Sequence, residues 1–486
     1  MFRHVLGATL FVFTGCTMIP RYERPAPPVA GVFPGATDRA ATSDAIRWSD
    51  FFADPRLKRL IELALANNRD LRLAALNVEK AQAQYRIQRA SLFPSIDLSG
   101  TFTRSLAAGY TTNPGDSNAS SATSIGTGLA SSIANQAVSS AAANQFSVSV
   151  GTTAYELDLF GRVRSLNRQA LEEYFSSAET RRSTQIALVA QVATQYITLR
   201  EEEEQLNLAR QTLMAVQKSY DLTKKTFDIG ATAESDVSSA DVQVQTARVN
   251  SYNYERLAGQ AANSLAAIVG APLPADLPPG RSLREQRVLA DIPAGLPSDL
   301  IARRPDILAA EHTLLSANAN IGAARAAFFP TITLTGSGGN SSVALSQLFT
   351  KVAQMWSFSP QITVPIFTGG SNLANLDVAK VSKRIEIATY EKTIQTAFRE
   401  VADSLVARTV YTRQISAQEA LVAAQQRRYD FALTRYRNGS DSYLGVLTAQ
   451  QDLYSAQQTL ISNRADRLAN LVTLYKALGG GWRQPQ

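Results

Sequence analysis

The chain of 486 residues has few of the residues that build disulfide frameworks and metal clusters. It contains one cysteine, Cys16, and two histidines. A single cysteine excludes a disulfide framework, and so few sulfur and imidazole groups leave almost no ligands for a Cys/His metal site. The net charge of +7 is spread along the chain without a polybasic block, a pattern that does not indicate a nucleic-acid partner. We expect no cofactor and no metal.

Glycine and proline are absent from two stretches of 68 residues, 162–229 and 371–438. The stretches are bracketed by glycines, at Gly161, Gly230, Gly370 and Gly439. At about 1.5 Å per residue, an unbroken helix of this length would span roughly 100 Å, whereas an average helix has about 11 residues. Helices this long are typical of proteins that bridge a distance or line a tube.

Other motifs recur with matched spacing, which indicates a tandem duplication. Asp70 lies 24 residues before Pro94, and Asp306 lies 24 residues before Pro330. We expect a first repeat at 51–270 and a second at 298–479, each with a helix, two strands and two long helices. A proline-rich surface linker, 271–297, joins them, and a tail, 480–486, follows. The expected strands are about 95–106, 145–157, 330–338 and 356–367, and the expected long helices are 162–229, 232–269, 371–438 and 442–478.

The four predicted strands alternate apolar and polar residues, as Ile96, Leu98 and Phe102 do against Ser99 and Thr101. One interpretation is a sheet half covered by helices. The other is a transmembrane barrel with apolar side chains toward lipid. Four strands cannot close, and open edges are not tolerated in hydrocarbon. Two copies give eight strands with a filled interior, and three give twelve, wide enough for water. A trimer is therefore the smaller assembly with a pore.

The N-terminus has the layout of a signal peptide, expected at 1–15. Its apolar run, Val5–Phe13, is too short for a bilayer span, which needs about 20 residues. The position of Cys16 resembles a bacterial lipobox, which implies cleavage before Cys16 and its acylation, for example with palmitate. The alternative is an ordinary signal peptide with a chance cysteine. Thr17 rather than aspartate implies export to the outer membrane, and an extended segment, 16–50, should follow.

Over nearly its whole length the chain resembles the TolC-like outer-membrane factors, in particular their NodT-type lipoprotein branch. The resemblance rests on the order and spacing of Cys16, Pro20–Pro25, Tyr155–Gly161, Arg303–Asp306 and Ala449–Tyr454. It implies an α+β membrane protein: a trimeric 12-stranded β-barrel in the outer membrane, with four strands per chain, continued by a long α-helical barrel through the periplasm.

The resemblance also implies a passive exit duct for small molecules such as drugs or toxic compounds. A periplasmic adaptor and an inner-membrane pump of the RND type would complete a tripartite efflux pump. A type I-like protein secretion duct is an alternative, and a structural coiled-coil lipoprotein is another, which the four strands disfavour. We find no nucleophile–base pair, so no enzyme is expected. His312 is interpreted as structural, and Glu201–Glu204 as a solvated helix face.

The turns that join the long helices are the candidate gate and adaptor contact. Gly230 and Gly439 suit left-handed C-caps, and Thr232 and Ser440 or Asp441 suit N-caps. The first turn is acidic and the second basic, so neighbouring turns could pair and close the inner end. Alternatively these are solvated charges worth at most about 1 kcal/mol per pair. The residues concerned are Asp228, Gly230, Glu234, Asp236, Arg435, Arg437, Gly439, Asp441 and Tyr443.

One feature of the family is missing after the second turn. Relatives often carry carboxylates there that ring the narrowest point, whereas the matching positions here are Gly445 and Thr448. The sequence therefore gives no support to a cation-binding constriction of the family type. Asp441 and Asp452 are the nearest acidic residues.

Overall fold

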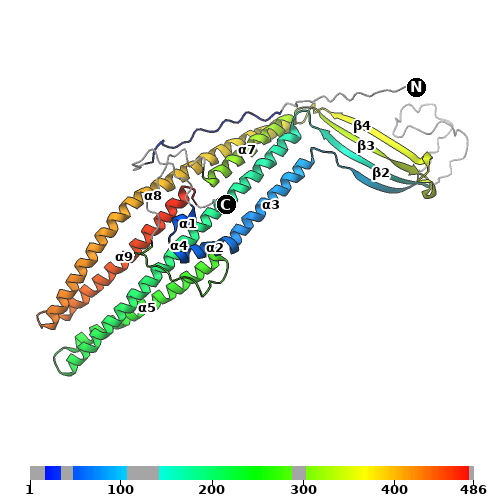
Figure 1. The fold of residues 1–486 in the computed structure, drawn as a ribbon. Coiled ribbons are helices and arrows are strands. Elements are labelled where there is room, and N and C mark those ends of the chain that lie inside the picture. Colours follow the sequence, from blue (N-terminus) through cyan, green and yellow to red (C-terminus); the bar gives the residue numbers. More distant parts are fainter. Residues whose placement is uncertain (1–16, 34–46, 107–141, 287–302, 481–486) are drawn as a thin grey trace, which may run out of the picture. The chain divides into compact units, whose positions relative to one another are not determined.

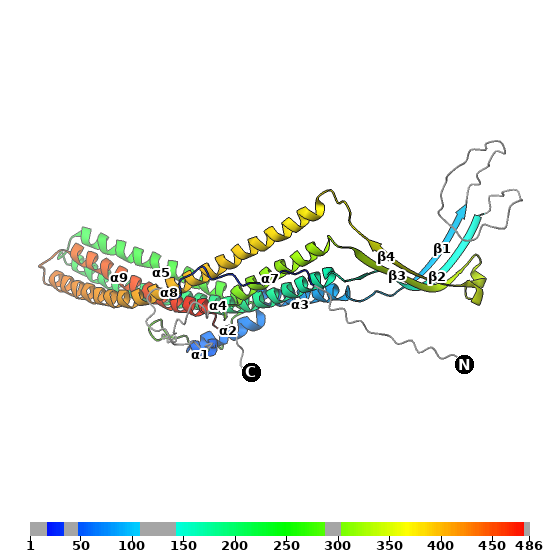
Figure 2. The ribbon, with the colours of Figure 1, turned by 90° about the horizontal axis from the view of Figure 1, so that it is seen from above.

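The computed structural model describes residues 17–33, 47–106, 142–286 and 303–480. They form two compact units, one containing a β-sheet and the other made of helices (Figures 1 and 2). Each unit contains residues from both predicted repeats. The units therefore cut across the duplication, because strands of the two repeats pair in one sheet and helices of the two repeats pack together.

The sheet unit contains one antiparallel sheet whose strands follow one another in chain order. The strands are β1 (Asp97–Leu106), β2 (Ala142–Leu157), β3 (Thr331–Ser342) and β4 (Gln354–Thr363). The β2–β3 pair joins the repeats, with Val150 opposite Gly338. A bulge between Thr152 and Tyr155 places Ala154 at φ 53°. In the described part of the chain, β1 and β4 are the edges of the sheet.

The strands start within about three residues of the predicted bounds, and two of them, β3 and β4, also end at other residues than predicted. β3 continues four residues beyond position 338, to Ser342, because Gly339 and Asn340 still pair with β4. β4 begins at Gln354 and ends at Thr363, so 364–367 lie outside it. The ladder ends there because Thr363 pairs with Thr331, the first residue of β3. Two short 3₁₀ turns, Leu345–Gln347 and Lys351–Ala353, connect β3 to β4.

The long helices match the stretches without glycine or proline. α4 (Arg162–Asp228) and α8 (Ser371–Arg437) each have 67 residues. α4 and α5 (Glu234–Val269) form one hairpin, and α8 and α9 (Tyr443–Ala477) form the other (Figure 1). The remaining helices are α1 (Trp48–Phe51), α2 (Pro55–Asn67), α3 (Arg69–Ala90) and α7 (Pro305–Ala326).

The largest apolar core of the helical unit lies between α1, α2, α4, α5 and α9. Leu283, from the predicted surface linker, belongs to it and is 1% exposed. Its N–H donates to Glu204 (2.6 Å), and the Gln286 side chain donates to the buried Asp54 carboxylate (2.6 Å). The prediction of a surface linker is therefore wrong for this part, because its backbone is fixed by buried polar partners.

A second core is covered by residues 17–33, which we call the N-terminal strap. They form neither helix nor strand, while α1 begins at Trp48, inside the segment predicted to be extended. Phe33 is buried with Ile307 and stacks on Phe398, with ring centroids 4.9 Å apart. Arg24 donates to both carboxylate oxygens of Glu311, each at 2.7 Å. The strap is thus an integral layer on α7 and α8.

Candidate functional site

Both hairpin turns have the glycine geometry that the sequence predicts. Gly230 has φ 76°, its N–H donates to Phe227 (2.8 Å), and Ala231 donates back to Thr226 (2.9 Å). Gly439 has φ 67°, with the same two bonds from Gly439 to Tyr436 and from Ser440 to Arg435, each 2.9 Å. A left-handed residue with such a bond pair is the Schellman cap, which satisfies the last carbonyls of a helix.

The expected N-caps of the following helices are wrong. α5 begins after Ala233, whose side chain cannot accept a hydrogen bond, and the Thr232 hydroxyl instead donates to Thr226 (2.8 Å). α9 begins after Ser442, which makes no side-chain cap bond, and Asp441 accepts from the Ser442 N–H (2.9 Å). The Thr232 hydroxyl and the Asp441 carboxylate thus make hydrogen bonds within the turns, and they do not cap the helices that follow.

The turn charges form a local pair within one chain. Arg435 Nε lies 3.3 Å from Asp441 Oδ2, and both side chains are largely exposed. Among the described residues, no ion pair joins Asp228, Glu234 or Asp236 to Arg435 or Arg437. Pairing between the acidic and the basic turn therefore stays a prediction about neighbouring copies.

Tyr443 belongs to the packing between the hairpins. It is 3% exposed and lies in an apolar cluster with Ala240 of α5. Its hydroxyl is 3.1 Å from the Ser219 hydroxyl of α4, and its ring centroid is 5.1 Å from that of Tyr436. Its position in the chain, next to the charged turn residues, predicted a place at the gate. Tyr220 and Tyr429 each lie ten residues before a turn glycine, and this recurrence was the signal in the sequence for an aromatic contact.

The positions after the second turn contain no carboxylate ring within one chain. Thr448 donates to the Leu444 carbonyl of its own helix (3.0 Å), and Asp452 pairs with Arg428 (2.5 Å). A side chain at Gly445 would lie 3.9 Å from the Asp441 carboxylate. Within the described ranges, no group of three or more His, Cys, Asp or Glu side chains is placed to hold a metal ion.

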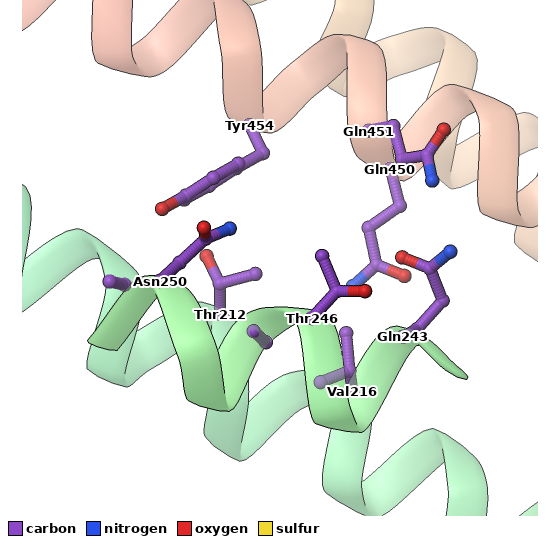
Figure 3. Close-up of a pocket in the computed structure, with 10 residues that line it drawn as sticks. Thr212, Val216, Gln243, Thr246, Asn250, Gln450, Gln451 and Tyr454 are labelled. Carbon is purple, nitrogen blue, oxygen red and sulfur yellow. The ribbon is translucent and has the colours of Figure 1, made fainter. Parts of the chain in front are cut away.

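A small pocket of about 90 Å³ lies between α4, α5 and α9 in the same helical unit. Tyr454 and Gln450 reach from α9 toward Thr246 and Asn250 on α5 (Figure 3). The Tyr454 hydroxyl is buried, with no hydrogen-bond partner in the part of the chain that the structure describes, and burial raises the pKa of Tyr454 to about 12. Hydroxyl and amide groups dominate the polar lining, so the pocket is uncharged.

Other candidate side chains are held by neighbours. The Nδ1 atom of His312 lies 2.7 Å from the Glu172 carboxylate. Glu201 accepts from Ser462 (2.7 Å), and burial raises the pKa of Glu201 and Glu202. The prediction of a solvated Glu201–Glu204 face is wrong for Glu201 and Glu204, which are half-buried and accept from Ser462 and from the Leu283 N–H.

None of the described helices combines the length and apolarity that crossing a membrane requires. Cys16, the predicted site of lipid attachment, lies outside the described residues, so its role stays a prediction.

Comparison with known proteins identifies the class. The family model described as outer membrane efflux protein matches residues 60–271 and 296–480. The chain therefore belongs to the outer membrane efflux protein family.

Similar proteins cover almost the whole chain. The toluene efflux pump outer membrane protein TtgC and the antibiotic efflux pump outer membrane protein ArpC, both of Pseudomonas putida, are each 47% identical over 483 residues, 98% of this chain and 95% of the relative. The solved open state of the Neisseria gonorrhoeae MtrE outer membrane channel is 38% identical, with a TM-score of 0.83. It covers 96% of this chain and 99% of MtrE.

These findings confirm the predicted resemblance, the α+β fold of a membrane channel subunit and the location in the outer membrane. They also confirm the predicted role as an outer-membrane exit duct in efflux. The family is one of efflux channels.

Proposed function

We propose that three copies of this chain form the exit duct of a tripartite efflux pump, docked to a periplasmic adaptor and an RND-type inner-membrane pump. The observation that carries the proposal is the open four-stranded sheet, with β1 and β4 as its edges. Unpaired strand edges in hydrocarbon are prohibitively costly, so the sheet must continue into neighbouring copies. Three sheets give twelve strands and a pore that water can fill.

The apolar surface of the sheet supports insertion in lipid. Leu98 on β1 and Trp356 and Phe358 on β4 are exposed in one chain, Trp356 at 82%. A sheet with such side chains on its outer face is unsuited to water, and an aromatic residue near a strand end is typical of membrane barrels.

The names of the relatives support a substrate class. TtgC and ArpC are named for the efflux of toluene and of antibiotics, and we infer that this chain exports small, largely apolar compounds of both kinds. Cys16 would carry the lipid anchor. The two hairpin turns would meet the adaptor and form the gate, through Asp228, Gly230, Glu234, Asp236, Arg435, Arg437, Gly439, Asp441 and Tyr443.

The test is complementation. The chain is expressed in a strain that lacks its own outer-membrane efflux channel but retains adaptor and pump, and survival with toluene or antibiotics is measured with cellular accumulation of a fluorescent substrate. Wild type should restore resistance and lower accumulation. Surface delivery of intact protein with no change in either readout would refute the export role.

The sheet offers a matched pair of variants. A side-chain carbon at Gly339 would lie 2.2 Å from the Val148 carbonyl oxygen, whereas one at Gly100 meets nothing within 4 Å. Gly339→Ala should therefore disturb the β2–β3 pairing between the repeats and reduce export, while Gly100→Ala should export as wild type does. Equal export by the two variants would contradict the role of this pairing in the duct.

A further inference from the structure

We propose that an arginine pocket on the helical unit binds a small oxyanion such as inorganic phosphate. The pocket has a volume of about 170 Å³ and is defined by Arg284, Glu419, Arg464 and Arg467, with Thr412 and Ile415 beside them. The proposal is independent of the export role, because none of these residues belongs to the sheet or to the hairpin turns.

The pocket is assembled from three parts of the chain that fold onto one another. Arg284 follows Leu283, whose side chain is anchored in the main core. Thr412, Ile415 and Glu419 share one face of α8, since residues three and seven positions apart lie on the same side of a helix. Arg464 and Arg467 are likewise three residues apart on α9. The positions of the arginines are thus set by packed elements.

The charges in the pocket are unbalanced. Three guanidinium groups face one carboxylate, and that carboxylate, Glu419, already accepts from Arg464 (2.8 Å). The Nε–H of Arg467 is buried and has no hydrogen-bond partner among the described residues. Buried donors in folded proteins are nearly always paired, so this atom calls for an acceptor that the described chain does not provide.

An oxyanion fits this need better than a spherical ion. Guanidinium groups present several N–H donors in one plane and bind phosphate or carboxylate oxygens in pairs. A phosphate could accept from Arg467 and Arg284 together and offset the excess positive charge. By bridging residue 284 to α9, the anion would fasten the segment after α5 to the second hairpin.

The experiment uses the full protein in mild detergent. Inorganic phosphate, malonate and chloride are titrated at constant ionic strength, with calorimetry for affinity and thermal unfolding for stabilisation. We expect saturable binding of phosphate, a rise in unfolding temperature with phosphate, and no such effect with chloride. Malonate distinguishes the two kinds of oxyanion. Binding of malonate but not phosphate would indicate a carboxylate ligand and contradict the phosphate proposal, whereas binding of phosphate but not malonate would indicate a phosphate ligand.

Variants assign the binding to the pocket. Arg467→Gln should weaken phosphate binding about tenfold or more. Arg284→Gln, on an exposed side chain, should weaken it several-fold without a risk to folding. Arg413→Gln removes the same charge from an exposed position of α8 outside the pocket, and it should retain wild-type affinity. Absence of saturable binding, or equal weakening in Arg413→Gln, would overturn the proposal and leave only solvent at Arg467.

Discussion

Helices α3 and α7 occupy matching positions in the two repeats and have 22 residues each, yet their surroundings differ completely. α3 has no buried residue within one chain, whereas α7 buries Ile307 and Leu314 in the second core. Leu76 and Ile87 of α3 are exposed, and the matching residues of α7 are His312 and Ala323. α7 is thus covered by its own chain, while α3 leaves an apolar surface that we expect another copy to cover.

The largest expected effect comes from a charge placed on the exposed apolar surface of α3. Leu76→Asp should abolish or strongly reduce the trimer, because three carboxylates would be buried between copies at about 3 kcal/mol or more each. Native mass spectrometry in mild detergent gives the trimer fraction. Asn77→Asp, at the neighbouring exposed position, should assemble normally. A Leu76→Asp protein that remains fully trimeric would place the interface elsewhere than on α3.

The repeats also differ in one hydrogen bond to the end of the last helix. The donor is the side chain of the residue just before α3 in the first repeat and just before α7 in the second. In the first, Asn68 donates to the Ile268 carbonyl (2.7 Å). In the second, the matching Arg304 donates to the matching Ala477 carbonyl (3.0 Å) and also binds Asp306 and Glu400. The duplication thus preserved the contact and changed it from a neutral to a charged one.

The next prediction compares these two contacts. Arg304→Ala should lower the free energy of unfolding by about 3 kcal/mol, because it leaves two half-buried carboxylates and a carbonyl without their donor. Asn68→Ala should cost about 1 to 2 kcal/mol, the usual loss for one buried hydrogen-bonding group. Thermal unfolding followed by circular dichroism measures both, with Arg413→Ala as the exposed control. Equal losses for the two variants would mean that the ion pairs of Arg304 contribute nothing.

Most of the fold was predictable from local sequence. The absence of glycine and proline over 162–229 and 371–438 predicted both ends of α4 and α8 to within one residue. The hydrogen bonds of a helix lie within one segment, so its bounds, unlike those of a strand, do not depend on pairing with a distant segment. Glycine at 230 and 439 likewise identified the left-handed caps. These features depend on backbone conformation, which short sequence patterns determine.

Features that depend on distant contacts were missed. Leu283 follows a run of prolines that reads as surface, but its burial depends on partners in α4, α2 and α9. The Glu201–Glu204 run has the pattern of a charged surface, and only the approach of Ser462 and Leu283 shows that Glu201 and Glu204 are half-buried and hydrogen-bonded. The packing role of Tyr443 required knowing that α9 lies against α4 and α5. No short pattern encodes such pairings.

A smaller effect is expected from the N-terminal strap, which packs on α7 and α8 of the second repeat. Arg24→Gln should lower the free energy of unfolding by about 1 to 2 kcal/mol, because Glu311 is a nearly buried carboxylate and loses its charged donor. Tyr22 still donates to it (3.1 Å), which limits the loss. Thermal unfolding and protease resistance of the strap report the change. Arg21→Gln is exposed and charge-matched, and a loss as large in that control would rule out a specific role for the Arg24 pair.

The smallest effect per copy is expected at the two hairpin turns, where the comparison is between an acidic and a basic end. An exposed pair between the basic turn of one copy and the acidic turn of its neighbour would be worth at most about 1 kcal/mol, but three-fold repetition of a change that size would total roughly 3 kcal/mol and shift a closed-to-open ratio by about a hundredfold. Arg435→Ser combined with Arg437→Ser should therefore give longer or larger openings in planar bilayers, and high salt should do the same to wild type. Lys224→Ser with Lys225→Ser removes two positive charges beside the acidic turn and should not loosen the gate. Unchanged conductance in the arginine double variant at both salt concentrations would contradict an electrostatic latch, and it would assign closure to the packing around Tyr443, which is already buried between the hairpins of one chain.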